Sequence, residues 1–228
     1  MPADYPDFPS AAQMLAYLED YARHYDLEGR IAFGTTVASA VPVVSDGVER
    51  WELTFGDGTR GIYKGVIACV GHHWDRRWPS YPGAFTGEML HSKDYKSPEQ
   101  LRGKRVLTIG GGNSACDIAS EAARVATSSH ISFRRGYWFL PKTMLGVPLV
   151  ELILPWMPLW LQRMFLRAML AVSVGDYQRY GLQKPDHAIF EHHPTLNSEL
   201  PHYIKHGRVT PHRDIACYDG EFVEFVDG

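Results

Sequence analysis

The sequence predicts a mixed α/β fold built around a parallel sheet. An apolar run over 104–109 leads into three glycines, a helix-like stretch over 113–125 and a second strand-like run over 130–134. This order of strand, helix and strand is typical of a βαβ unit, whose two strands pair in parallel. With 228 residues, of which 45% are hydrophobic and 21% charged, the chain is long enough to bury a core.

The first hundred residues predict one helix and three strands before a long connection. Met14, Leu15, Leu18 and Tyr21 recur at spacings of three and four, which predicts an amphipathic helix over 10–25 with Ser10 as its N-cap. Strands are expected over 31–37, 50–55 and 60–70, with a tight hairpin turn at "FGDGT" between the last two. Residues 71–100 are rich in Gly, Pro and Ser and predict a functional crossing loop.

Residues 137–175 are apolar on nearly every face and predict a helical insertion. Charged residues and prolines interrupt the run, so it does not predict a membrane span, which needs about 20 predominantly apolar residues. Three interpretations stay open: a buried helical insertion, a surface over 149–172 that contacts lipid or a partner, or the lining of an apolar substrate channel. Short strands are expected at 208–210 and 221–226.

Composition excludes several classes of function. The net charge of -3 provides no basic field for nucleic acid. Cys69, Cys116 and Cys217 are far apart, which predicts neither a disulfide framework nor a thiolate zinc site and favours a cytoplasmic location. The N-terminus has no secretory pattern. Histidines 72–73 and 192–193 form adjacent pairs, whose side chains seldom point the same way in regular structure, and no metal site is expected.

The stretch "VLTIGGGNSACDIASEAARVA" carries a G-x-G-x-x-A pattern at Gly110, Gly112 and Ala115. The first glycine permits the tight turn, the second lets the backbone approach a pyrophosphate, and the small third residue lets helix and strand pack closely. Free N–H groups at the start of the helix bind phosphate oxygens. The pattern therefore predicts a Rossmann-like dinucleotide site.

The end of the second strand indicates which nicotinamide cofactor binds. NAD sites place an acidic residue there for the ribose 2′-hydroxyl, whereas this strand runs into Arg134 and Arg135. Two guanidinium groups favour the 2′-phosphate of NADP. The alternative is two solvated arginines at a strand end.

Phe85, Gly87, His91 and Tyr95 form an F-x-G-x-x-x-H-x-x-x-Y pattern directly before the glycine-rich stretch. With "FPSAAQMLAYLEDYARHYDL", "VIACVG" and "PTLNSELP" in the same order, the chain resembles the flavin-containing monooxygenases, which use FAD and NADPH. The resemblance implies a flavoprotein architecture with two dinucleotide-binding domains. The family's first G-x-G-x-x-G is not found here, so the chain resembles a fragment: a truncated FAD domain plus an NADPH domain with a helical insertion.

The resemblance also implies domain limits. Residues 1–84 correspond to a partial FAD-binding domain and 85–103 to the linker with the fingerprint. Residues 104–207 correspond to the NADP-binding domain with the insertion 137–175, and 208–228 to the start of the return to the FAD domain.

Residue roles carry over from the family position by position. Gly110, Gly112, Asn113, Ser114 and Ala115 would hold the NADP pyrophosphate, and Arg134 with Arg135 the 2′-phosphate. Val37, Ala68 and Gly71 would lie near FAD. His91 is expected to organise the linker or its motion rather than to transfer protons, and Asn197 in "TLNSEL" is a candidate for approaching the nicotinamide or substrate.

The implied activity is a monooxygenation in which the cofactors carry the difficult chemistry. In the family NADPH reduces FAD, the reduced flavin captures dioxygen as a C4a-hydroperoxide, and a soft nucleophile takes one oxygen atom at nitrogen or sulfur. The substrate is expected to be an apolar amine, sulfide or ketone. A Baeyer–Villiger monooxygenase is one alternative, although its fingerprint ends in Trp where this chain has Tyr95. The other is a catalytically silent NADP-binding module that does not retain FAD.

Overall fold

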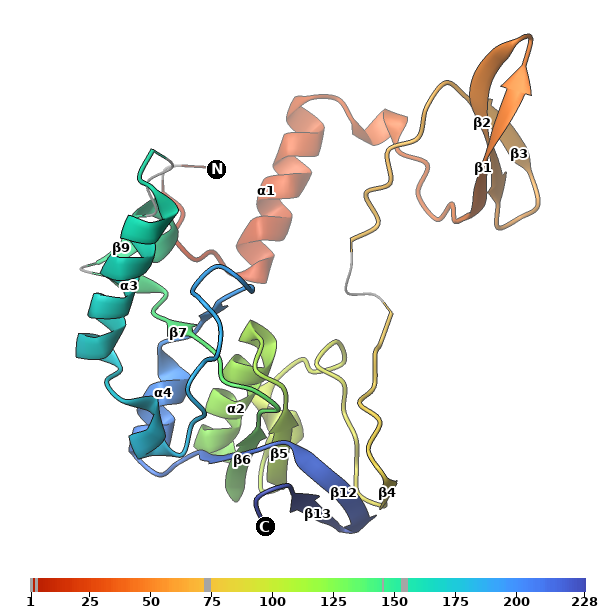
Figure 1. Ribbon diagram of the computed structural model, residues 1–228. Coiled ribbons are helices and arrows are strands. Elements are labelled where there is room, and N and C mark those ends of the chain that lie inside the picture. Colours follow the sequence, from red (N-terminus) through yellow and green to blue (C-terminus); the bar gives the residue numbers. More distant parts are fainter. Residues whose placement is uncertain (1, 3, 72–74, 145, 153–155) are drawn as a thin grey trace. The chain divides into compact units, whose positions relative to one another are not determined.

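The computed structural model describes residues 2, 4–71, 75–144, 146–152 and 156–228, and the chain divides into two compact units, 1–72 and 73–228 (Figure 1). None of the described residues of the first unit is buried. The second unit holds a contiguous apolar core, to which the sheet, the helix after the glycine turn and the insertion all contribute. Each unit is described separately below.

The first unit contains a helix and a three-stranded antiparallel sheet. Helix α1 (Ala11–His24) begins after Ser10, whose side chain accepts the N–H of Gln13 in a capping box, as predicted. A 3-10 turn (Glu28–Arg30) and strands β1 (Val37–Ser45), β2 (Val48–Phe55) and β3 (Arg60–Tyr63) follow, in the order β1-β2-β3. The predicted turn between β2 and β3 is confirmed.

The strand predicted over 31–37 is wrong. Gly34 has a φ of +66°, and the strand starts only at Val37 and continues to Ser45. The β1–β2 hairpin turns at Asp46 and Gly47, both with positive φ, as an Asp-Gly hairpin turn requires. The third strand is also shorter than the predicted 60–70 and ends at Tyr63.

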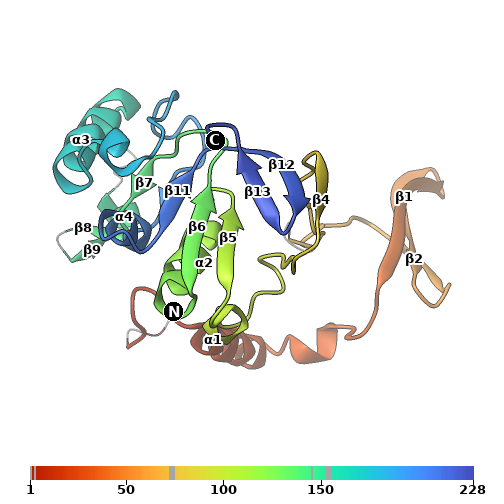
Figure 2. The same ribbon diagram turned by 90° about the horizontal axis from the view of Figure 1, so that it is seen from below.

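The second unit is built on the predicted βαβ motif. Strands β5 (Arg105–Ile109), β6 (Ser128–Ser132) and β11 (Thr210–His212) are parallel in the order β11-β6-β5 (Figure 2). Helix α2 (Asn113–Val125) covers the predicted residues and packs on β5 and β6 through Cys116, Ala119 and Ala123. Strand β6 begins and ends two residues before the predicted 130–134.

A second small sheet joins segments from both sides of the βαβ motif. Strand β4 (Gly83–Phe85) lies in the predicted loop 71–100, as does the 3-10 turn Pro98–Leu101, and β4 pairs in parallel with β12 (Ile215–Gly220). Strand β12 pairs in turn with β13 (Phe222–Phe225). Gly83 is required here, because a Cβ on it would lie 1.9 Å from the carbonyl oxygen of Tyr218.

The insertion predicted over 137–175 is only partly helical. Strands β7 (Phe139–Leu140), β8 (Thr143–Met144) and β9 (Val147–Pro148) and a 3-10 turn (Leu149–Leu152) precede helix α3 (Leu159–Ser173). A further 3-10 turn (Tyr177–Tyr180), strand β10 (Thr195–Leu196), which pairs in parallel with β7, and helix α4 (Glu199–Lys205) follow.

Burial corrects the interpretation of a wholly buried helix in this insertion. Within α3 only Leu166 and Leu170 are buried, whereas Trp160, Met164 and Phe165 are exposed. Among the helices of the described residues, none combines the length and the apolar character that crossing a bilayer requires.

Candidate functional site

The glycine-rich turn lies at the carboxyl end of β5, beside the end of β6. Ile109 pairs with Ser132, and the N–H of Gly110 donates to the carbonyl of Ser132 at 3.0 Å. Gly110 has a φ of +120°, which side-chain-bearing residues rarely adopt. Gly112 is the N-cap of α2, and no side chain caps the helix there. The N–H groups of the first turn are therefore available to an anion.

Gly111, in the middle of the turn, is enclosed by two side chains from later in the sequence. A Cβ on Gly111 would lie 2.4 Å from the ring of Tyr137, so only glycine fits under this ring. On its other side the hydroxyl of Thr195 donates to the carbonyl oxygen of Gly111 at 2.6 Å. The backbone of the turn is thereby fixed by contacts with the start of the insertion and with a residue beyond its end.

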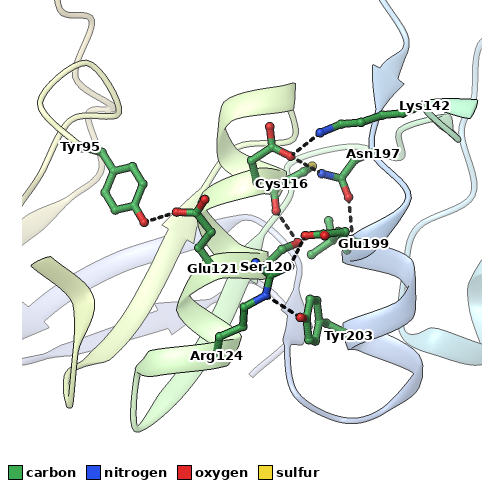
Figure 3. A network of polar contacts seen from close by, with 11 residues as sticks. Tyr95, Cys116, Ser120, Glu121, Arg124, Lys142, Asn197, Glu199 and Tyr203 are labelled. Atoms are coloured by element: carbon green, nitrogen blue, oxygen red, sulfur yellow. Dashed lines mark hydrogen bonds and ion pairs between the residues drawn. The ribbon is translucent and has the colours of Figure 1, made fainter. Parts of the chain in front are cut away.

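Further hydrogen bonds fasten the segment after Thr195 to α2. The N–H of Leu196 donates to Oδ1 of Asn113 at 2.8 Å. Nδ2 of Asn197 donates to Oδ1 of Asp117 at 2.7 Å (Figure 3). Oδ1 of Asn197 accepts the N–H of Leu200, and Asn197 is only 1% exposed. The structure therefore places Asn197 in a buried link between the segment and α2.

The two arginines follow the end of β6. Arg134 is exposed and Arg135 half-buried. The guanidinium carbon of Arg135 lies 5.5 Å from the centre of the Tyr137 ring, which also contacts the glycine turn. Nε of Arg135 is buried and has no hydrogen-bond partner among the described residues. A buried guanidinium donor without an acceptor beside this glycine turn fits an anionic ligand.

The remaining pyrophosphate candidates share the surface of this turn. Gly112, Asn113 and Ser114 are exposed, and Ala115 is half-buried. A Cβ on Gly112 would meet no atom within 4 Å, so the space outside the turn is open.

The fingerprint segment contacts α2 one turn after the contact of Asn197 with Asp117. His91 is half-buried, its Nδ1 accepts the N–H of Lys93 at 3.1 Å, and its ring contacts Trp78 edge-on. The hydroxyl of Tyr95 donates to the carboxylate of Glu121 on α2. Burial, followed by this carboxylate, raises the pKa of Tyr95, which keeps the phenol protonated as a donor. His91 and Tyr95 also line a groove of about 840 Å³ along β5.

The described residues offer no obvious reactive side chain near the turn. Burial raises the pKa of the Cys116 thiol to about 12, which makes it an inert packing residue. Among the described residues, no three His, Cys, Asp or Glu side chains gather as metal ligands.

The candidates for FAD lie in the first unit. Val37 begins β1, while Ala68 and Gly71 follow β3, and all three are exposed. No strand, glycine turn and helix occur in succession within the described part of this unit. These residues therefore do not by themselves form a cradle for a flavin dinucleotide.

Sequence reasoning missed Thr195 and Gly111. Thr195 and Gly111 are 84 positions apart, and no local pattern announces their contact. The triple glycine was a partial signal, because a G-x-G pattern requires only its outer glycines while the middle one is here required by Tyr137.

Known proteins resemble this chain along its whole length. The family model "Flavin-binding monooxygenase-like" matches residues 1–228. Flavin-containing monooxygenase 5 of Homo sapiens is 35% identical over 244 residues, covering 100% of this chain and 46% of the relative. The probable indole-3-pyruvate monooxygenase YUCCA7 of Arabidopsis thaliana is 32% identical, with 100% and 56% covered. The chain thus spans about half the length of the curated relatives it matches.

Solved structures share the fold. A steroid monooxygenase bound to NADP superposes with a TM-score of 0.73 at 19% identity, covering 97% of this chain and 56% of that chain. A flavin monooxygenase from Stenotrophomonas maltophilia gives 0.68 at 23% identity, with 100% and 56% covered. The predicted α/β, Rossmann-like class is confirmed. FAD and NADPH are the cofactors of the family. By its family match and its relatives, this chain belongs to the flavin-binding monooxygenase-like family.

Proposed function

We propose that the second unit binds NADPH at the glycine turn. The backbone N–H groups from Gly112 to Ala115 would hold the pyrophosphate, with Gly110 making the turn tight enough. The observation that carries the proposal is the uncapped start of α2 beside a buried, unpartnered Nε of Arg135. Arg134 and Arg135 would pair with the 2′-phosphate, since both follow the strand next to the turn.

The whole protein of which this fold is typical would be an FAD- and NADPH-dependent monooxygenase. NADPH supplies a hydride when bound, and dioxygen supplies the oxygen transferred to the substrate. The residues of this chain bind and orient the nucleotide: the turn fixes the pyrophosphate, and Tyr137 and Arg135 border it. No residue in this part of the site needs to act as a nucleophile.

We propose a soft nucleophile, an apolar amine or sulfide, as substrate. Tyr95 at the last fingerprint position favours nitrogen or sulfur oxygenation over the Baeyer–Villiger oxidation of ketones. A relative that is 31% identical, dimethylaniline monooxygenase 2 of Oryctolagus cuniculus, is named as N-oxide-forming, which supports oxygenation at nitrogen. A silent NADP-binding module is the second candidate, because the described part of the first unit offers no phosphate-binding turn for FAD.

The domain limits and location are part of this proposal. Residues 1–84 and 208–228 would belong to an FAD-binding domain, 85–103 to the linker and 104–207 to the NADP-binding domain. The pairing of β4 with β12 supports this division, because it joins the end of the first segment to the last one in a sheet of their own. Three free cysteines are compatible with a reducing, cytoplasmic setting.

Helix α3 is the proposed contact with a membrane surface. Trp156, Leu159, Trp160, Met164 and Phe165 are exposed, and the helix carries arginines but no acidic residue. Exposed indoles with nearby arginines suit the interface of an anionic bilayer. Co-sedimentation with vesicles containing anionic lipid tests this proposal, and a chain that stays in the supernatant contradicts it.

Calorimetric titration of the purified chain tests the nucleotide site. We expect NADP to bind and to bind more tightly than NAD, because only NADP offers the arginines a 2′-phosphate. Equal affinity for the two nucleotides contradicts the assignment. The absorbance spectrum after gel filtration tests whether the chain retains FAD. We expect this chain to bind NADP more readily than FAD, and a chain that keeps stoichiometric FAD contradicts this expectation.

A further inference from the structure

The carbonyl of Gly111 is held by a threonine on the far side of the insertion. Thr195 donates its hydroxyl to this carbonyl at 2.6 Å, and both residues are buried, Thr195 being 2% exposed. We propose that Thr195 is a positioning residue for dinucleotide binding, which fixes the Gly111–Gly112 peptide so that the N–H of Gly112 faces the pyrophosphate. This inference rests on the proposed NADP site.

The geometry of the peptide unit relates the carbonyl of Gly111 to the N–H of Gly112. A peptide bond is planar and trans, so its C=O and N–H point in opposite directions. The carbonyl of Gly111 points inward to Thr195, and the N–H of Gly112 therefore points away from it, toward the open surface outside the turn. A hydrogen bond in the interior thus determines the direction of a donor at the surface.

Three successive glycines make such an anchor necessary. Glycine populates positive and negative φ about equally, so a peptide between two glycines can rotate at little steric cost. The contact of Tyr137 with Gly111 restricts where the α-carbon lies, but a ring of carbon atoms does not distinguish one orientation of the carbonyl from the other. The hydroxyl of Thr195 favours the observed orientation. A reversed peptide could donate its N–H to the hydroxyl oxygen, but the buried hydroxyl proton would then lose the acceptor that it has here.

Thr195 is itself held in place by backbone pairing. Strand β10, which carries it, is parallel to β7, and the N–H of Thr195 donates to the carbonyl of Trp138 at 3.1 Å. The next residues bind α2: Leu196 bonds to Asn113, and Asn197 bonds to Asp117. The anchor is therefore rigid with respect to the helix whose N-terminus it serves.

Thr195→Val tests the proposal, because valine keeps the shape of threonine and removes the hydroxyl. We expect the dissociation constants of NADP and NAD to rise by the same factor, about tenfold, because both nucleotides share the pyrophosphate. Thr195→Ser, which keeps the donor, should bind within about threefold of the wild-type chain. In spectra of [15N]glycine-labelled protein, the Gly112 amide should give one sharp signal in the wild type and a split or broadened one in the valine variant.

Ser198→Ala is the matched control. Ser198 lies in the same segment and accepts the N–H of Lys142, without touching the turn, so its loss should leave both dissociation constants unchanged. Thr195→Ala gives the same comparison if the valine variant does not fold. A valine variant that melts at lower temperature but binds both nucleotides as tightly as the wild type overturns the positioning role alone. A wild-type chain that binds neither nucleotide overturns this role and the proposed function together.

Discussion

Tyr95 and Glu121 join the fingerprint segment to the nucleotide-binding helix. The phenol of Tyr95 donates to the carboxylate of Glu121, which lies on α2, the helix that begins at the glycine turn. The last residue of the F-x-G-x-x-x-H-x-x-x-Y pattern is thereby fixed to an element of the proposed NADP site. A tryptophan at this position would present its N–H from a larger ring, so the contact with Glu121 would differ.

Tyr95→Phe should lower the free energy of unfolding by about 1 kcal/mol, because it removes one hydrogen bond to a carboxylate that keeps access to water. Urea denaturation measures the change. A double-mutant cycle with Glu121→Gln isolates the pair. Strictly additive effects of the two substitutions would show that the contact contributes nothing in solution.

Substitution by alanine should lower stability at Gly110 but hardly change it at Gly112. At Gly110 the φ of +120° strains any side-chain-bearing residue, so Gly110→Ala should destabilise the fold by about 1 to 3 kcal/mol. Gly112 has a φ of −78° and open space at its Cβ, so Gly112→Ala should change stability by less than about 0.5 kcal/mol. Its methyl group would nevertheless stand where the pyrophosphate approaches.

The expected result for Gly112→Ala is therefore a folded chain that binds NADP at least about tenfold more weakly. Thermal unfolding and calorimetric titration of both variants measure the two effects separately. If Gly112→Ala binds NADP like the wild type, the pyrophosphate does not lie against this turn.

The paired substitution Arg134→Ala and Arg135→Ala should weaken NADP binding by about 10- to 100-fold and NAD binding by less than about threefold. The reason is that only NADP carries the 2′-phosphate for which the free Nε of Arg135 is suited. Titration of both nucleotides measures the ratio. Arg102→Ala, which removes an exposed arginine paired with Glu99, serves as the control. Equal losses for both nucleotides would mean that the arginines only support the fold.

The central βαβ motif could be predicted because its signals are local. The glycines and the apolar spacing of "NSACDIASEAARV" predict α2 to the residue, because the start of the helix and its buried face are encoded in consecutive residues. The β1–β2 hairpin was not predicted, although Asp46 and Gly47 are a hairpin signal, because the preceding apolar run "IAFGTTV" was interpreted as the strand.

Other features depend on contacts between distant parts of the chain. Thr195 reaches Gly111 across 84 positions, and strand β12 exists because β4 and β13 pair with it from either side. The insertion shows that composition does not predict burial. Its apolar character is evident from the sequence, but only the structure shows that most of α3 faces outward.

A pair of histidines in the parallel sheet should make stability depend on pH. Nδ1 of His130 on β6 lies 3.0 Å from Nε2 of His212 on β11, and the His212 ring stacks on Phe225. Burial lowers the pKa of both side chains; for His212 the charge of His130 lowers it further, while Asp227 opposes the shift. A contact of this kind holds one proton between the two nitrogens, and protonation of both rings would place two N–H groups face to face.

Because the folded-state pKa values lie below those of the unfolded chain, the unfolded chain binds more protons as the pH falls below the ordinary histidine value of about 6.5. The stability associated with the neutral pair is therefore full above that pH and decreases as the pH falls toward the lowered pKa values of the folded state. We expect the unfolding free energy of the wild type, measured in urea, to decrease from pH 7.5 to pH 5.5. In the double variant His130→Gln, His212→Gln this decrease should be smaller, because neither glutamine titrates. His206→Gln, at an exposed position after α4, should retain the full decrease. If the double variant loses as much stability as the wild type over this interval, the pair does not govern the pH dependence, and the responsible groups lie elsewhere in the chain.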